Sequence, residues 1–307
     1  MKLATTLVHK GAMDIALHAV SSFARNFHQS YRLQIHTDGS PDAGDHALLV
    51  SAARGHGMTA EIVTPADRKP LVKERLSGYP LTRKLLERGG YFTKLEMPVW
   101  IEKPYFYFDS DIVWLRPVAN LTPPGFGNAF STESWSWYYG VCHDEKWIAE
   151  RTPRRVNSGF YHLAQEFPFQ RMEDMLEKRM FDPTIPFNTD QEIMAYLYHE
   201  MVYYHIDDLK RSRVGSLYDL KSETCAALHF PGGMWKAHLD QIEALGARPP
   251  LADAEIRFSP SIPLNKLELF RMRSFMALSK SSLLQMPLSI FRHLRKLSRM
   301  RKSSHPA

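Results

Sequence analysis

Hydrophobic and polar positions along the first 240 residues follow two alternating periodicities. Short runs of β-branched and aromatic residues predict buried strands, and between them apolar residues recur every three or four positions, which predicts amphipathic helices. The predicted strands are residues 2–8, 31–40 with a turn at the end, 58–64 and 105–115, and the predicted helices are residues 13–27, 45–57, 81–89 and 91–100. Strands that alternate with helices predict an α/β domain whose mostly parallel central sheet is flanked by helices.

The strand within YFYFDSDIVW is interrupted by two aspartates, Asp109 and Asp111. Buried carboxylates are costly unless a partner neutralises them, so these two either lie in solvent beyond the strand or hold a cation. The order of elements places them at the C-terminal end of a strand, where open α/β sheets bind ligands. Carboxylates at i and i+2 on a turning chain can bind one divalent ion, whose other ligands are water and phosphate oxygens. Such an ion suits the departure of a nucleoside diphosphate. Taken alone, a D-x-D motif is a weak signal, and a solvated strand-to-loop turn is the simpler interpretation.

Three later stretches carry further candidate binding groups. The sequence RRVNSGFYHL places Asn157 and Ser158 at the start of a predicted strand, and FNTDQEIMAYLY places Asp190 and Gln191 in the first turn of a predicted helix. ALHFPGGMWK places His229 at a strand end, followed by two glycines and a lysine. Each stretch also fits a structural role, as a turn before a strand, a helix capped by Thr189 and Glu192, and a structural histidine.

Taken in order, the D-x-D, N-S-G, D-Q and H-x-x-G motifs with a following lysine resemble family 8 of the retaining glycosyltransferases. This family includes bacterial lipopolysaccharide galactosyl- and glucosyltransferases and glycogenin. The resemblance covers residues 1 to about 240 and implies a Rossmann-like GT-A fold. It also implies transfer of a hexose from a nucleotide-diphosphate sugar, most often a UDP sugar, to a saccharide or glycolipid acceptor.

The resemblance implies a role for each matching position. Asp109, Asp111 and His229 would bind Mn²⁺ or Mg²⁺ on the donor's diphosphate. The implied donor-binding residues are Lys94, Asn157, Ser158, Gly232 and Lys236, and the implied catalytic residues are Asp190 and Gln191. The implied chemistry is front-face transfer with retention, in which the acceptor hydroxyl enters on the side from which the diphosphate leaves.

The sequence departs from the family pattern at three places. Lys94 stands where the family usually has an arginine, so the charge is kept and the bidentate fork is lost. Lys236 comes one residue later than the family's lysine, and no Pro-Trp pair follows it. The first strand lacks the acidic and asparagine residues that commonly hold the nucleobase, and offers His9, Lys10 and Asp14 instead.

Charge is distributed unevenly along the 307 residues. The net charge is +6, yet residues 265–307 contain ten Lys or Arg and one acid, so the first 264 residues carry a net charge of −3. Within this tail, residues 287–302 have apolar positions at helical spacing with basic residues on the other faces, which predicts a basic amphipathic helix. We therefore expect a transferase domain at 1–260 and a tail at 261–307 that binds an anionic membrane surface through residues 265–302.

Other observations limit the alternatives. Cys142 and Cys225 lack disulfide-framework or zinc spacing, which favours a reducing compartment, and no apolar run approaches the length of a membrane span. The expected location is cytoplasmic, on the inner face of the cytoplasmic membrane. A sugar nucleotidyltransferase would need a glycine-rich phosphate loop after the first strand, and VHKGAMD is not one. A non-catalytic protein that binds membrane or nucleic acid through the tail is the third hypothesis, but no nucleic-acid-binding motif is present.

Overall fold

The computed structural model describes residues 1–119, 121–123, 125, 127–131, 157–181, 190–198, 201–204, 210–212, 226–246, 252–253, 256 and 258–259. These residues all fall within one compact unit, Met1–Pro263. The predicted tail at 261–307 and its amphipathic helix lie outside the described residues, so both stay predictions. Within the described ranges, no helix is long and apolar enough to cross a membrane.

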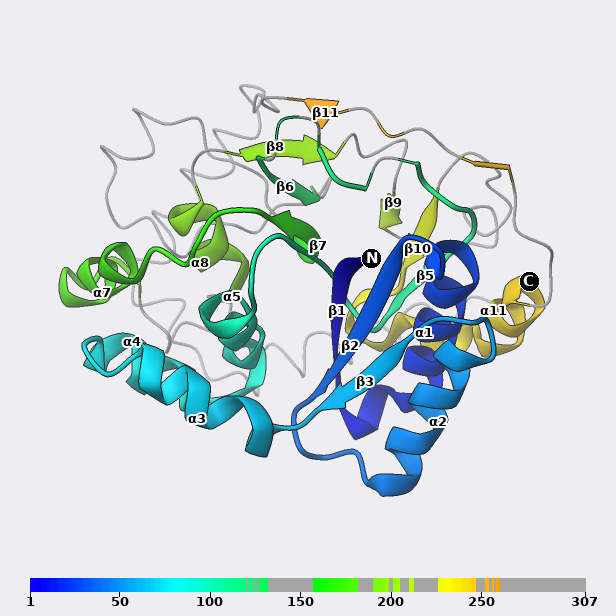
Figure 1. Ribbon diagram of the computed structural model, residues 1–307, viewed down its shortest axis with the longest axis horizontal. Helices are drawn as coiled ribbons and strands as arrows, with labels where there is room; N and C mark the ends of the chain where they lie inside the picture. The colour runs from blue at the N-terminus through cyan, green and yellow to red at the C-terminus, as the bar shows by residue number, and fades with distance from the viewer. Residues whose placement is uncertain are drawn as a thin grey trace, which may run out of the picture. The chain divides into compact units, whose positions relative to one another are not determined.

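The centre of the fold is a mixed sheet in which the described strands occur in the order β11-β8-β6-β7-β4-β1-β2-β3 (Figure 1). Its parallel half contains β1 (Lys2–Val8), β2 (Tyr31–Thr37), β3 (Ala60–Val63) and β4 (Tyr105–Phe108). The other half contains β7 (Asn157–Leu163), β6 (Asn128–Ser131), β8 (Met201–Tyr204) and β11 (Phe258–Ser259). β7 runs antiparallel to both β4 and β6, so the direction of the strands changes beside β4.

A small second sheet lies beside the first. It consists of β5 (Ile112–Trp114), β10 (Ala227–His229) and β9 (Lys210–Ser212) in the order β5-β10-β9. β10 is antiparallel to β5 and parallel to β9. The predicted strand 105–115 is therefore two strands, β4 and β5, which belong to different sheets, and this part of the expectation was wrong.

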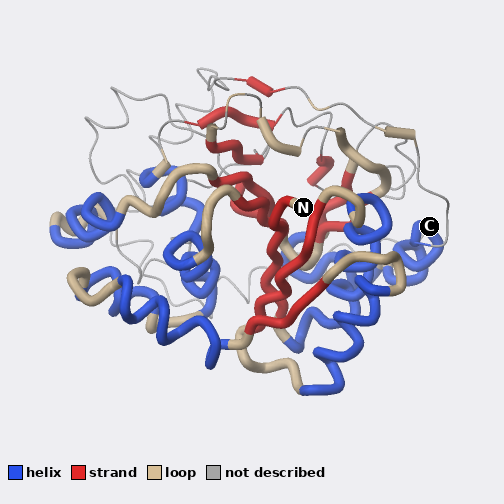
Figure 2. Tube along the Cα trace, in the orientation of Figure 1, coloured by secondary structure: helices blue, strands red, loops and turns tan. Residues whose placement is uncertain are grey.

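Helices cover both faces of the central sheet (Figure 2). On one side lie α1 (Met13–Phe27), α2 (Ala43–Arg54) and α11 (Leu239–Gly246). On the other side lie α3 (Pro65–Arg75), α4 (Pro80–Leu86), α5 (Glu96–Trp100), α7 (Phe169–Glu177) and α8 (Asp190–Leu197). Three 3-10 helices, η1 (Lys10–Ala12), η2 (Gly90–Leu95) and η3 (Pro231–Ala237), connect described elements. The expected α/β architecture with a mostly parallel sheet between helices is confirmed.

The composition of β4 follows from the two layers that enclose it. Alternate residues of a strand face opposite sides, so Phe106 and Phe108 point to the α1 side and Tyr105 and Tyr107 to the α8 side. On the first side Phe108 stacks on Phe23, with centroids 4.4 Å apart. All four β4 side chains are buried, which explains the uninterrupted aromatic run.

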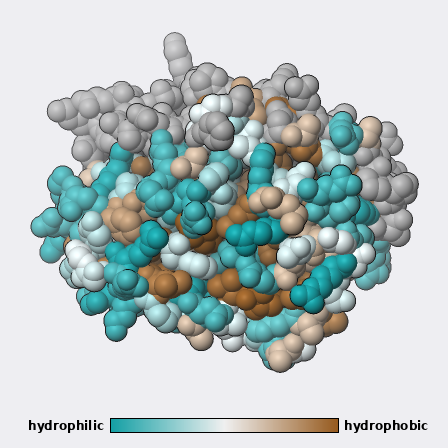
Figure 3. Space-filling model, viewed as in Figure 1, coloured by the Kyte–Doolittle hydropathy of each residue, from teal (hydrophilic) through white to brown (hydrophobic). Residues whose placement is uncertain are grey.

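The surface is mixed in character, with hydrophobic patches among polar groups on the face of Figure 3. The exposed large apolar side chains among the described residues are Met1, Leu48, Leu71, Leu81 and Tyr91. Of these, Tyr91 has 71% of its surface exposed, and it is the one aromatic residue among them.

Candidate active site

The segment between β4 and β5 forms a tight turn that is fixed to β7. The backbone N–H of Asp109 donates to the carbonyl of Gly159 at 2.6 Å, and the N–H of Ile112 donates back to the carbonyl of Asp109 at 3.1 Å. Asp109 and Asp111 therefore leave the sheet at the C-terminal ends of its parallel strands, as the sequence predicted.

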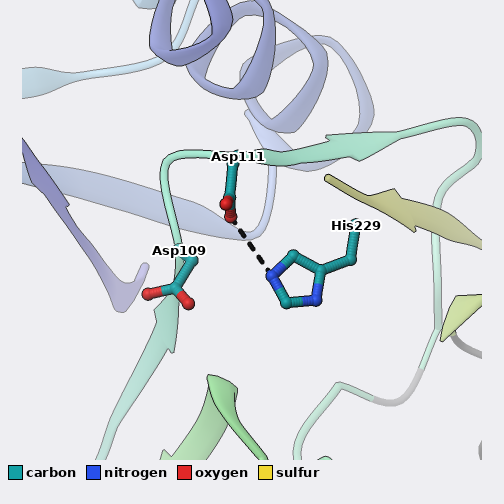
Figure 4. A group of neighbouring side chains, drawn as sticks. All are labelled: Asp109, Asp111 and His229. Atoms are coloured by element: carbon teal, nitrogen blue, oxygen red, sulfur yellow. Dashed lines mark ion pairs between the residues drawn. The ribbon is translucent and has the colours of Figure 1, made fainter. Parts of the chain in front are cut away.

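His229 reaches the same place from the second sheet. In the β5-β10 ladder His229 is paired with Ile112, and the N–H of Phe230 donates to the carbonyl of Asp111 at 3.0 Å. The imidazole Nε2 lies 3.3 Å from Asp111 Oδ1, and Figure 4 shows the two aspartates and the imidazole converging. One potential ligand atom from each of these three residues lies within 4.8 Å of the other two.

The residues around this point suit a divalent ion. Two carboxylates and one imidazole form an oxygen- and nitrogen-rich donor set of the kind that binds Mg²⁺ or Mn²⁺. Gly159 keeps the space beside them open, because a Cβ there would lie 2.5 Å from Asn157 Oδ1 and 3.4 Å from Asp109 Oδ2. We refer to Asp109, Asp111 and His229 as the ligand triad.

Lys94 extends from η2 into the same region. Its Nζ lies 2.7 Å from Asp109 Oδ1 and 3.5 Å from Asp190 Oδ2, and it donates to Ser158 Oγ at 3.1 Å. Burial alone would lower the pKa of Lys94, but the carboxylates of Asp109, Asp190 and Asp111 outweigh it and raise the pKa above its usual value. The ammonium is therefore charged at any physiological pH.

The start of β7 and the start of α8 are joined by an amide network. Gln191 Oε1 accepts from Asn157 Nδ2 at 3.1 Å and from the backbone N–H of Ser158 at 3.2 Å. Asn157 Oδ1 accepts from the N–H of Gly159 at 2.9 Å, and Asp190 lies 2% exposed beside Lys94. The structure thus brings Lys94, Asn157, Ser158, Asp190 and Gln191 around the ligand triad.

Comparison with known proteins identifies the architecture. No protein-family model and no curated protein matches the sequence. Among solved structures, the galactosyltransferase LgtC, in complex with donor and acceptor sugar analogues, matches with a TM-score of 0.50 and 16% identity, over 81% of this chain and 97% of that one. At this identity the match establishes the fold. The chain has the GT-A fold.

Two further GT-A neighbours support this assignment. The bifunctional glycosyltransferase WbbM has a TM-score of 0.52 and 11% identity, over 81% of this chain and 50% of that one. The glycosyltransferase GlyE of Streptococcus pneumoniae has a TM-score of 0.51 and 12% identity, over 81% of this chain and 60% of that one. The resemblance of the motifs and the likeness of the structures thus agree on a GT-A glycosyltransferase fold similar to family 8.

The glycine and the lysine that the family resemblance assigns to donor binding after β10 are Gly232 and Lys236. Gly232 and Lys236 lie in η3, the 3-10 helix that follows His229. Lys236 is exposed, its Nζ lies 5.4 Å from the centroid of the Trp235 ring, and no hydrogen bond or ion pair joins it to another described residue. No hydrogen bond or ion pair among the described residues joins Lys236 to the ligand triad. Its donor-binding role and that of Gly232 stay predictions, and Thr189 of the predicted helix cap lies outside the described residues.

Lys10, one of the residues that stand after the first strand in place of the family's usual acidic and asparagine residues, has two ion-pair partners. Lys10, which follows β1, pairs through Nζ with Asp42 at 2.5 Å and with Asp45 at 3.2 Å. These two acids form the capping box of α2. The pKa of Asp42 is lowered to about 2, mainly by its hydrogen-bonded ion pair with Lys10.

Sequence reasoning missed one residue that contacts the ligand triad. The hydroxyl of Tyr107 donates to Asp109 Oδ1 at 2.6 Å, and its ring stacks on Tyr161 with centroids 4.8 Å apart. The pKa of Tyr107 is raised well above its usual value, mainly by burial and also by the Asp109 carboxylate, so the proton stays on the phenol. The period of two in the segment 105–109 puts residues 107 and 109 on the same side, but the sequence alone does not specify that the hydroxyl reaches the carboxylate.

Proposed function

We propose that this protein is a metal-dependent glycosyltransferase that moves a hexose from a nucleotide-diphosphate sugar, most simply a UDP sugar, to a saccharide or glycolipid acceptor. The observation that carries the proposal is the convergence of Asp109, Asp111 and His229, from two separate sheets, at the C-terminal edge of a GT-A sheet. Ligands in open α/β folds bind at this edge.

The ligand triad would hold Mn²⁺ or Mg²⁺, which neutralises charge on a departing diphosphate when it is bound. Lys94 adds a fixed positive charge on the same side and is held there by Asp109, Asp190 and Ser158. The family resemblance assigns Asn157 and Asp190 to hydrogen bonds with the donor sugar; Asn157 contacts Gly159 and Asp190 contacts Lys94, beside the ligand triad. The protein's own contribution is thus positioning and electrostatic stabilisation rather than covalent chemistry.

Two observations favour transfer with retention. An inverting enzyme would need a carboxylate base at the acceptor hydroxyl, and Asp190 is the obvious candidate. Its carboxylate lies 3.5 Å from the Lys94 ammonium and its side chain is 3% exposed, so it is paired with a lysine rather than open to an acceptor hydroxyl. Gln191 Oε1 is held by two N–H donors, which fixes the amide in one orientation beside Asn157. An ordered amide of this kind supports the front-face mechanism that the resemblance implies.

The basic tail extends the proposal to the acceptor. A tail that binds anionic lipid through residues 265–302 would hold the enzyme on the inner face of the cytoplasmic membrane, where a lipid-linked saccharide in cell-surface glycan synthesis would be the acceptor. Flotation of the full chain with phosphatidylglycerol vesicles, at low and high salt, tests this directly. Salt-sensitive binding to these vesicles supports the tail's role, whereas equal binding to neutral phosphatidylcholine vesicles or preferential binding to RNA contradicts it.

The decisive experiment for the activity is a thermal-shift panel of UDP, GDP, CDP and ADP and their common sugars, with and without Mn²⁺. A ligand that binds only the native state raises the melting temperature, so the cognate nucleotide should do so only when metal is present. The Asp111→Asn variant should lose this metal-dependent shift. If no nucleotide stabilises the folded protein with metal, the proposed activity is wrong.

A further inference from the structure

A cavity of about 390 Å³ lies between α3, α4 and η2, on the side of the sheet that carries Lys94. Its volume falls within the range of small-ligand sites. Its walls include three aliphatic side chains, Val72, Leu76 and Leu86, and a larger number of charged ones. α3, α4 and α5, the helix that η2 directly precedes, are seen together in the left half of Figure 1.

The 3-10 helix η2 separates this cavity from the candidate active site. A 3-10 helix has three residues per turn, so its side chains form three rows. Gly90 and Thr93 line the cavity, and Phe92 and Leu95 are buried in the core. The third row consists of Tyr91 and Lys94, and Lys94 contacts Asp109 and Asp190. The cavity and the active site therefore lie on adjacent faces of one short helix.

Tyr91 lies in the row of Lys94, next in sequence to the cavity-lining Gly90. It precedes Lys94 by one turn of η2, about 6 Å along the helix axis. Its side chain is 71% exposed, although aromatic rings are usually covered in a folded protein. Gly89 and Gly90, on its N-terminal side, have φ of +66° and +60°, so the chain bends there in a conformation that glycine adopts without strain. An exposed, rigid ring at this place provides a flat surface for the apolar side of a sugar.

Some of the charged side chains that line the cavity form ion pairs with one another, and others do not. Arg68 is bound to Glu96, and Arg83 lies 3.8 Å from Glu87. Lys69 and Lys73, four residues apart on one face of α3, both line the cavity, and no hydrogen bond or ion pair joins either to another described residue. The lining also includes Asp38, whose carboxylate accepts from Ser40. Basic side chains still outnumber acidic ones in the lining, four to three, and the neighbouring ammonium groups of Lys69 and Lys73 favour an anionic ligand.

We propose that this cavity is the acceptor subsite and that it takes an anionic saccharide. One ring of the saccharide stacks on Tyr91, its phosphate or carboxylate group lies on Lys69 and Lys73, and its free hydroxyls extend toward Lys94. This inference rests on the proposed glycosyltransferase function and deepens it by naming the chemical class of the acceptor.

Calorimetric titration of the full chain with three trisaccharides tests the proposal. The probes are trigalacturonic acid, a maltotriose that carries one phosphate, and neutral maltotriose. We expect at least one anionic probe to bind more tightly than maltotriose, with an affinity that falls as salt is added. The double variant Lys69→Ala/Lys73→Ala should weaken that binding about tenfold and leave maltotriose unchanged.

Two sets of control variants separate a specific site from general effects of charge and folding. Lys84→Ala/Lys178→Ala removes two exposed lysines that do not line the cavity, and should leave binding of the anionic probe unchanged. Tyr91→Ala should weaken all probes that bind, whereas Tyr91→Phe, which keeps the ring, should not. The preference between the carboxylate and the phosphate probe identifies the anionic group.

The outcomes for the two proposals are distinct. If neither anionic trisaccharide binds, or if both pairs of lysine variants weaken binding equally, the acceptor subsite is overturned. The Mn²⁺-dependent nucleotide shift should persist in every one of these variants. Its absence from the unaltered protein would overturn the glycosyltransferase function, whatever the trisaccharides do.

Discussion

Lys94 and Glu96 are two residues apart in the chain, and each belongs to a different group of buried charged side chains. The two groups differ in how their charges are balanced. Glu96, at the start of α5, pairs with Arg68 at 2.5 Å, and both side chains are almost sealed, with 7% and 2% exposed. Arg68 also donates to the carbonyl of Thr37 at 2.6 Å. Lys94, at the end of η2, is 13% exposed and lies between Asp109 and Asp190. We refer to the first as the closed pair and to the second as the open cluster.

The two groups have different functional meanings. In the closed pair one cation meets one anion, and the remaining donor capacity is used on a backbone carbonyl, as a buried structural ion pair requires. In the open cluster one ammonium, that of Lys94, lies between two carboxylates, those of Asp109 and Asp190. Asp109 and Asp190 share this one ammonium, and a divalent cation at the ligand triad would add positive charge beside them. Charge balance within a cluster therefore separates scaffold from site more clearly than burial does.

Asp109→Asn should have the largest effect on activity. The change removes a metal ligand and keeps the shape of the side chain, so we expect the rate to fall at least about a thousandfold, or about 4 kcal/mol in activation free energy. Removing one of several adjacent carboxylates relieves like-charge repulsion, so the metal-free protein should remain folded. Steady-state kinetics with Mn²⁺ and thermal melts without metal measure the two effects. The exposed Asp240→Asn is the matched control, and an unfolded Asp109→Asn protein would contradict the contrast with the closed pair.

Arg68→Met should show the opposite behaviour. It leaves Glu96 buried without its partner, which costs about 3 kcal/mol or more of unfolding free energy. The double change Arg68→Met/Glu96→Leu should recover most of this loss, because both charges are then gone. Urea denaturation measures these differences, and the Mn²⁺-dependent nucleotide shift should persist in both variants. Equal stability of the single variant and the unaltered protein would mean that the closed pair has no structural role.

Much of the fold could be predicted because its signals are local. The helix at 13–27 was predicted with the same bounds as α1, since its apolar residues follow the helical period throughout. The division between β4 and β5 could not be predicted in this way, because both halves of the segment are apolar and buried. What separates them is the pairing of β5 with β10, more than a hundred residues later. No helix was predicted at 65–75, where α3 contains an internal proline, Pro70.

The candidate site shows the same limit. Asp109 and Asp111 were found from a local pattern, two carboxylates at the end of an apolar strand. His229 lies 118 positions beyond Asp111, and residue spacing alone could not link it to them; the order of motifs within a family resemblance did. Tyr107 was treated only as a core residue, because its ring does pack in the core. Its hydroxyl contact with Asp109 depends on a side-chain orientation that the sequence pattern does not specify.

Tyr107→Phe should have an intermediate effect and sharpens the contrast within the open cluster. The hydroxyl fixes one oxygen of the Asp109 carboxylate, and loss of such an outer contact typically weakens metal binding 10- to 100-fold. The Mn²⁺ dissociation constant, measured by electron paramagnetic resonance without substrate, reports this directly. Tyr161→Phe is the matched control, because its ring stacks on Tyr107 and its hydroxyl has no bond to Asp109. Equal effects of the two variants would assign the change to packing instead.

The smallest effect concerns His36, which lies on β2 beside the closed pair. It is fully buried, neither of its ring nitrogens has a hydrogen-bond partner, and its ring lies edge-on to Trp100. The pKa of His36 is lowered to about 3, mainly by burial and also by the positive charge of the neighbouring Arg68. The closed pair is already balanced, so a second positive charge beside Arg68 would be unfavourable.

A lowered pKa in the folded state makes stability fall with acid. Above the unfolded-state pKa of about 6.5, His36 is neutral in both states; below it the unfolded chain binds a proton that the native protein rejects until about pH 3. The expected loss is about 1 kcal/mol between pH 6.5 and 5.5, before most carboxylates titrate. Urea denaturation across this range should show a shallower pH dependence for His36→Leu than for the exposed-site control His9→Leu. If the two variants have the same slope, His36 takes up a proton in the folded protein, and the closed pair accepts an additional charge as readily as the open cluster does.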